Sequence, residues 1–116
     1  MRFHIGIDLI KIRRAEYLIS RINNKHKYFT DFEIEAGINH LVHSFSAKEA
    51  LIKSYSGPKN VKLNELELRY SSTGQPKLTY TKPLQSNNRQ EIIVSFSRVE
   101  ELLACVLLRV SWLESD

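Results

Sequence analysis

One long helix, predicted over residues 41–55, constrains the fold of this chain more than any other feature of the sequence. The segment Ser56-Gly57-Pro58 ends it, because a glycine followed by a proline is a strong helix stop. Shorter helices are predicted over residues 13–22 and after the capping-box pattern of Thr30 and Glu33. The strand patterns lie at residues 3–10, 65–71, 77–81 and 91–97. Strands towards both ends with helices between them indicate an α+β fold with a mainly antiparallel sheet.

The first and last segments carry the least simple patterns. Residues 3–10 place Phe3, Ile5, Ile7 and Leu9 on one face at period two, and the segment is mostly apolar, which predicts a central strand. Residues 99–112 are ambiguous, because a Glu-Glu-Leu-Leu-Ala composition favours a helix whereas residues 105–110 form an apolar run compatible with a strand. Local propensity alone predicts a helix in this last segment.

The size and composition fit one globular domain over residues 1–116, because 42% hydrophobic and 26% charged residues are usual for such a domain. A single cysteine, Cys105, cannot form an internal disulfide. No apolar run is long enough to span a membrane, and the charge of Asp8 interrupts what would be the apolar region of a signal peptide. We therefore expect a soluble, cytoplasmic protein.

Basic residues are concentrated in the first half of the chain. Residues 1–62 hold 11 Lys and Arg against six Asp and Glu, whereas residues 63–116 hold six against seven. A basic half favours a polyanionic partner such as a nucleic acid, a phosphorylated small molecule or an acidic protein, although it is also explained by a solvated surface. No aromatic-studded basic strand or recognition-helix motif supports a nucleic acid.

The predicted helix at residues 41–55 carries a carboxylate and two ammonium groups. Lys48 falls within the apolar stripe, and Glu49 and Lys53 stand one turn apart beside it. The stripe itself consists of Leu41, Phe45, Ile52 and Tyr55. A surface ion pair and a lysine with an apolar stem explain these residues. They also suit a metal-bound phosphorylated ligand, because Mg²⁺ binds one or two carboxylates together with substrate phosphates.

Asp8 is the natural candidate for a second carboxylate. It interrupts an apolar strand, and a buried carboxylate without partners is costly. Either Asp8 is hydrogen-bonded for structural reasons at the end of its strand, or it joins Glu49 in holding a metal ion. The residues alone leave both interpretations open.

Five segments occur in the order found in one enzyme family. Gly6-Ile7-Asp8-Leu9, followed by Arg14, is similar to the opening signature of the holo-acyl-carrier-protein synthases. Phe45-Ser46-Ala47-Lys48-Glu49-Ala50, followed by Lys53, resembles that family's Phe-Ala-Ala-Lys-Glu-Ala signature. Thr30-Asp31-Phe32-Glu33, Thr73-Gly74-Gln75-Pro76 and Val94-Ser95-Phe96-Ser97 resemble three further elements. The matches cover nearly the whole chain.

The resemblance implies a phosphopantetheinyl transferase fold, in which residues 103–110 form a strand instead of a helix. It implies transfer of phosphopantetheine from coenzyme A to a serine of apo-acyl carrier protein. By this resemblance Asp8 and Glu49 hold magnesium, and Lys53 contacts the coenzyme phosphates or the reacting centre. Coenzyme A would also meet Lys48, Ser97 and Arg98, the last of which stands where the family usually has His.

The resemblance also implies partners. Arg14, with Arg13 and Arg21, would meet the acidic recognition helix of the carrier protein, and three copies of the chain would form a homotrimer with coenzyme A between neighbouring subunits. A second hypothesis is a non-catalytic relative that binds coenzyme A or a carrier protein, because Arg98 and Ser44 depart from the family pattern. A basic nucleic-acid-binding domain is the third.

Overall fold

The computed structural model describes residues 1–57, 60–82 and 88–113. Along the chain run β1 (Arg2–Lys11), α1 (Ile12–Ser20), α2 (Asp31–Ala36), α3 (Ile38–Lys53), β2 (Leu66–Tyr70), β3 (Pro76–Tyr80), β4 (Asn88–Val99) and β5 (Leu102–Leu113). Two short 3-10 turns, η1 (Lys25–Lys27) and η2 (Leu63–Glu65), precede α2 and β2. This order of elements confirms the predicted α+β fold.

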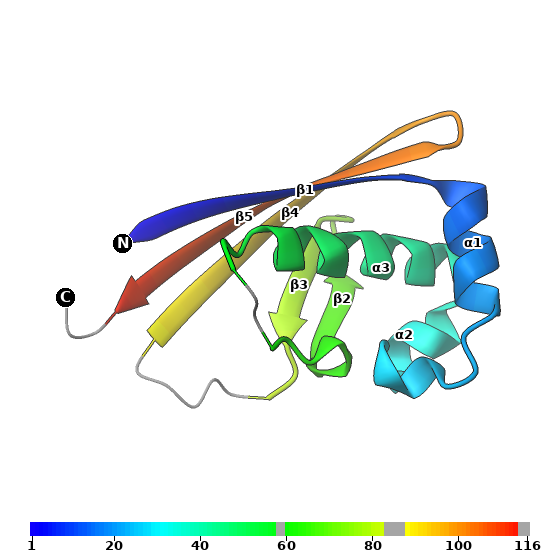
Figure 1. The fold of residues 1–116 in the computed structure, drawn as a ribbon, viewed down its shortest axis with the longest axis horizontal. Helices are drawn as coiled ribbons and strands as arrows, with labels where there is room; N and C mark the ends of the chain where they lie inside the picture. The colour runs from blue at the N-terminus through cyan, green and yellow to red at the C-terminus, as the bar shows by residue number, and fades with distance from the viewer. Residues whose placement is uncertain (58–59, 83–87, 114–116) are drawn as a thin grey trace.

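The strands form two antiparallel sheets. One has the order β1-β5-β4, and the other is the hairpin β2-β3. Helix α3 runs along one face of the three-stranded sheet, with α1 and α2 together at one end and the start of β1 and the end of β5 at the other (Figure 1). Among the described residues, no helix is both long and apolar enough to cross a lipid bilayer.

The C-terminal segment is a strand, so the helix favoured by local propensity is wrong. In β5, Leu103, Cys105 and Leu107 are buried while Val106 between them is 47% exposed, which is a burial period of two. β5 pairs with β1 on one side and with β4 on the other. Because both edges of β5 are hydrogen-bonded, tertiary context overrides its helical composition, as the family resemblance implied.

β1 lies at an edge of the sheet, so the predicted central position is also wrong. Its four apolar residues share one face, as predicted, but this face points away from α3. Phe3, Ile5, Ile7 and Leu9 are between 57% and 65% exposed. Gly6 and Asp8 are buried on the other face, against the helix. The apolar composition of β1 therefore belongs to an outer surface of the sheet.

Gly6 brings the main chain of β1 directly against α3. A Cβ atom at this position would lie 1.7 Å from the carbonyl oxygen of Ala50, so only glycine fits. Ala47 and Ala50 are fully buried, and their small side chains allow the close backbone approach. The strand that carries Asp8 is consequently held at the shortest possible distance from the helix that carries Glu49.

A local signal sets the start of α2 as predicted, whereas α3 spans Ile38–Lys53 instead of the predicted residues 41–55. Thr30 accepts a hydrogen bond from the N–H of Glu33, and the Glu33 side chain accepts one from the N–H of Thr30, which completes the capping box of α2. The apolar stripe predicted on α3 is only partly right, because Leu41 is buried and Ile52 is 37% exposed. α3 contacts both the sheet and α2, so it is buried from more than one side.

Candidate active site

Asp8 forms the centre of a charged cluster where β1 meets α3. The Asp8 side chain is 8% exposed, and each of its carboxylate oxygens has a partner on the helix. Lys53 Nζ lies 2.9 Å from Oδ1, and Ser46 Oγ donates to Oδ2 at 2.9 Å. Because the Lys53 side chain is 52% exposed, the cluster opens to solvent at this end.

Glu49 adds a second carboxylate, one turn before Lys53 on α3. Burial raises the pKa of Glu49, the neighbouring charge of Asp8 raises it further, and Lys53 lowers it. The carboxylates of Asp8 and Glu49 therefore act on each other electrostatically. The structure brings together all three residues that the sequence placed in the candidate site, and Lys53 forms an ion pair with Asp8.

This donor set suits a hard divalent cation. Asp8 already holds one positive group, the ammonium of Lys53, and carboxylate oxygens are the ligands that Mg²⁺ prefers. In the described part of the chain, no three His, Cys, Asp or Glu side chains gather into a metal site. Asp8 and Glu49 would therefore hold magnesium only together with water and substrate phosphates, which is a common arrangement for this ion.

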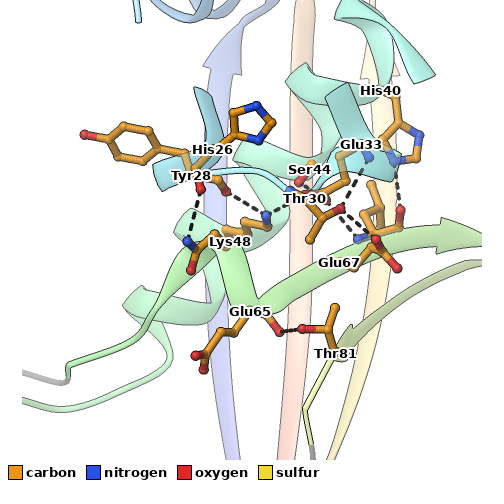
Figure 2. Close-up of polar contacts among 12 residues, drawn as sticks. His26, Tyr28, Thr30, Glu33, His40, Ser44, Lys48, Glu65, Glu67 and Thr81 are labelled. Atoms are coloured by element: carbon orange, nitrogen blue, oxygen red, sulfur yellow. Dashed lines mark hydrogen bonds and ion pairs between the residues drawn. The ribbon is translucent and has the colours of Figure 1, made fainter. Parts of the chain in front are cut away.

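Lys48 lies elsewhere, in the interior between α2 and α3. Its side chain is 3% exposed, and its Nζ lies 2.8 Å from Glu33 Oε1 and 2.8 Å from the carbonyl oxygen of Tyr28 (Figure 2). Burial lowers the pKa of Lys48, whereas the Glu33 carboxylate opposes this effect. A phosphate contact would require the pair to separate, so the structure does not bring Lys48 to the predicted coenzyme site.

Ser97 and Arg98, near the end of β4, lie apart from the cluster within one chain. Ser97 is in the same cross-strand row as Leu9, so its side chain points to the outer face of the sheet, opposite to Asp8. Arg98 is exposed, and its Nε donates to the carbonyl oxygen of Glu100. One chain does not gather the predicted coenzyme contacts around Asp8.

Two other segments that resemble the family pattern lie close together. The turn that joins β2 to β3 and the middle of β4 border a hollow of about 490 Å³. Its lining includes Gly74, Gln75 and Pro76 from the turn, Ser95 and Phe96 from β4, and His43 from α3. His43 also packs edge-on against the ring of Phe96, with centroids 5.0 Å apart.

The three arginines predicted to bind the carrier protein are exposed on α1 or directly after it. Arg13 Nε lies 2.8 Å from a carboxylate oxygen of Glu101, in an ion pair that is open to solvent. The Arg21 guanidinium lies 5.4 Å from the ring centroid of Tyr17. Arg14 stands on the same side of the helix as Tyr17 and Arg21, at the spacing of successive turns.

Several polar side chains that support the site were not predicted. Ser46 is fully buried against Asp8, and its only signal is a serine where the family signature has alanine. Arg109 interrupts the apolar run of β5 and is 5% exposed. Its Nε donates to Ser54 Oγ and its Nη2 to the Ser54 carbonyl, while its guanidinium lies 3.8 Å from the Tyr55 ring centroid. A cation therefore holds the negative end of α3.

The fold and this cluster fit one class of enzyme. The family model described as the 4'-phosphopantetheinyl transferase superfamily matches residues 4–105. The holo-[acyl-carrier-protein] synthase of Fusobacterium nucleatum is 31% identical over 124 residues, which cover 90% of this chain and 97% of the relative. The chain belongs to the holo-[acyl-carrier-protein] synthase family of that superfamily and is an enzyme of the phosphopantetheinyl transferase class.

Other relatives and solved structures agree. The holo-[acyl-carrier-protein] synthase of Thermodesulfovibrio yellowstonii is 29% identical over 82 residues, which cover 64% of this chain and 73% of the relative. The apo synthase structure from Chronobacterium ammoniagenes has a TM-score of 0.78 at 20% identity and covers 97% of this chain and 99% of that one. The coenzyme A complex from the same organism has a TM-score of 0.76 at 22% identity, with coverages of 94% and 97%. Because these sequence identities are low, the two structures show that this chain has the same fold.

Proposed function

We propose that this chain acts in the cytoplasm and transfers the phosphopantetheine arm of coenzyme A to a serine of apo-acyl carrier protein, with magnesium as its cofactor. The observation that carries the proposal is the cluster of Asp8, Glu49 and Lys53 at the junction of β1 and α3. The names of its relatives support the acceptor, and a coenzyme A complex of the same fold supports the donor.

The chemistry requires positioning and charge neutralisation more than covalent help from the protein. The serine hydroxyl gives its proton to a base such as a water molecule, and its oxygen forms a bond to the phosphorus of the pantetheine arm. The pyrophosphate bond breaks to leave adenosine bisphosphate. Magnesium, when bound, neutralises the phosphate charge. In this proposal Asp8 and Glu49 hold the ion, and Lys53 reaches the phosphates through its solvent-exposed end.

We further propose a homotrimer with coenzyme A bound between subunits. The support is the outer face of the three-stranded sheet, which exposes apolar side chains on all its strands. They include Phe3, Ile5, Ile7 and Leu9 on β1, Ile93 on β4 and Val106 on β5. Contiguous apolar surface of this kind marks an interaction site. Because Ser97 shares this face, a neighbouring subunit would bring its own groups close to it.

The proposed carrier-binding surface is the exposed side of α1. Arg14 and Arg21 flank Tyr17 and Leu18, which are 57% and 40% exposed. An acidic helix with a few apolar side chains complements such a surface, because rim charges steer association and apolar side chains supply contact area.

The deciding experiment is mass spectrometry of several apo-carrier proteins incubated with the enzyme and coenzyme A, with and without EDTA. The proposal expects a mass increase of one phosphopantetheine on a serine, and its loss when EDTA removes the metal. Coenzyme A binding without transfer to any carrier would favour the non-catalytic alternative. Transfer that is unaffected by EDTA would remove magnesium from the proposal.

A further inference from the structure

A buried carboxylate joins three elements on the side of α3 away from β1. Glu33 of α2 is fully buried, and both of its oxygens are hydrogen-bonded. Oε1 accepts from the Thr30 N–H at 3.0 Å and from Lys48 Nζ at 2.8 Å. Oε2 accepts from the Leu68 N–H of β2 at 2.9 Å and from the Ser44 hydroxyl. Figure 2 shows Thr30, Ser44 and Lys48 converging on this one side chain.

Two of these donors, Ser44 and Lys48, lie one turn apart on α3. Another pair on the same helix, Ser46 and Lys53, holds Asp8. Successive residues of an α-helix are turned by about 100° around its axis. Viewed down the axis of α3, the mean side-chain directions of the two pairs therefore differ by about 170°. Helix α3 is therefore held by polar contacts on opposite sides, to α2 and β2 on one side and to β1 on the other.

Glu49 lies between the two sides, about 50° around the helix from the pair that holds Asp8. Its direction depends on the rotation of α3 about its own axis. A rotation of about 10° displaces the end of a side chain on the helix surface by about 1 Å. A misplacement of about 1 Å at a reacting centre costs on the order of 10²-fold in rate.

We propose that Glu33 and Lys48 are positioning residues for this active site. Their ion pair sets the rotation of α3 and thereby holds Glu49 and Lys53 towards Asp8. The inference rests on the proposed function of Asp8, Glu49 and Lys53, and it gives Lys48 a different role from the phosphate contact implied by the family resemblance.

The chemistry of the pair supports positioning over simple stabilisation. Apolar side chains of similar volume stabilise a core as well as a buried ion pair does, or better. An apolar contact, however, has no preferred direction, whereas charge-assisted hydrogen bonds do. The carboxylate of Glu33 accepts from two residues of α3, Ser44 and Lys48, and two attachments fix both the rotation and the axial position of the helix.

The test is the double variant Glu33→Gln/Lys48→Met, which leaves no unpaired charge in the core. We expect it to fold, to lose on the order of 10²-fold in kcat, and to keep its KM for coenzyme A and for the carrier protein within about threefold. The control is Glu65→Gln, which removes the carboxylate of a solvent-open ion pair with Lys82 and should keep wild-type kcat.

A crystal structure of the double variant supplies a readout that does not depend on turnover. We expect the separation of Asp8 Oδ1 and Lys53 Nζ to exceed hydrogen-bond distance. An unchanged contact, or a wild-type kcat, overturns the inference. If the double variant does not fold, Ser44→Ala decides: a kcat lowered several-fold at unchanged KM supports the inference, and a wild-type kcat overturns it.

The two proposals fail in different ways. If the wild-type protein transfers nothing to any carrier protein, the proposed function fails. The crystallographic comparison of wild type and double variant still decides whether Glu33 and Lys48 orient α3.

Discussion

Asp8 and Lys53 are 45 positions apart in the sequence, and 2.9 Å separates the carboxylate oxygen of one from the ammonium nitrogen of the other. The Asp8 side chain is 8% exposed, whereas the Lys53 side chain is 52% exposed. The pair therefore spans the boundary between the core and the solvent. A charged ligand that arrives from solvent can exchange with Lys53 without opening the core.

The Lys53→Ala variant should fold and lose activity. Asp8 keeps its hydrogen bond from Ser46, and the lost side chain is half exposed, so the melting temperature should change by only a few degrees. Loss of one electrostatic contact to the reacting phosphates should lower kcat on the order of 10²–10³-fold. Steady-state transfer kinetics check this, with Lys82→Ala as the matched exposed-lysine control. Normal turnover, or an unfolded variant, contradicts the role given to Lys53.

The Glu49→Gln variant should be inactive and normally folded. Glutamine keeps the shape of the side chain but removes one of the two anionic ligands, so metal affinity should drop and kcat should fall on the order of 10²–10³-fold. Without metal the variant should be at least as stable as wild type, because two neighbouring carboxylates repel each other. Its melting temperature should no longer respond to magnesium plus coenzyme A, as differential scanning fluorimetry measures. The control is Glu35→Gln, and a wild-type metal response in Glu49→Gln would falsify the metal site.

The Arg14→Glu variant should weaken carrier-protein binding far more than coenzyme A binding. Arg14 is exposed on α1, and reversing its charge opposes an acidic partner during association. Surface plasmon resonance with the carrier protein and calorimetry with coenzyme A measure the two affinities, and Lys82→Glu serves as a charge-reversal control. Equal losses for both ligands contradict the carrier-binding surface.

The Ile7→Lys variant should be monomeric, folded and poorly active. Ile7 is 57% exposed on the outer face of the sheet, so the substitution removes no core contact within one chain. A lysine on an apolar face buried between subunits leaves an unpaired charge there, which is costly. Light scattering coupled to size-exclusion chromatography should give a trimer for wild type and a monomer for the variant. A wild-type monomer with full activity rules out the site between subunits.

The Gly6→Ala variant should be destabilised by at least about 2 kcal/mol, because the added methyl group overlaps the Ala50 carbonyl oxygen. Chemical denaturation measures the free energy of unfolding. Gly57→Ala is the control, since a Cβ there has no atom within 4 Å and should change stability by less than about 1 kcal/mol. Equal stability of the two variants would mean that β1 and α3 separate easily.

The sequence predicted most reliably the features whose partners are close along the chain. The capping box of Thr30 and Glu33 needs only four consecutive residues, and α2 begins as that pattern predicts. The position of β1 and the conformation of residues 102–113 depend on strand neighbours, so their patterns were insufficient. An apolar strand face on the outside of a sheet and one facing the core have the same periodicity.

The candidate site, too, was predicted only in part from the sequence. Glu49 and Lys53 were singled out because they stand one turn apart on the predicted helix, and Asp8 because its charge interrupts an apolar pattern. The family resemblance joined the three residues in one site, and the structure brings them together. Lys48 interrupts a pattern in the same way, but its partner Glu33 comes from another helix, 15 residues earlier. Spacing along one helix does not show which neighbouring element faces each side, so the direction of Lys48 could not be predicted.

The contact between Gly6 and the Ala50 carbonyl has a consequence for second-site suppression. The atom that excludes a side chain at position 6 belongs to the main chain, and every amino acid at position 50 carries the same carbonyl group. A larger residue at position 6 therefore cannot be rescued by a smaller residue at position 50, whereas enlarged side chains elsewhere in a core can be accommodated by trimming a neighbour. In a library that varies both positions, the active clones should carry glycine at position 6 whatever residue is selected at position 50.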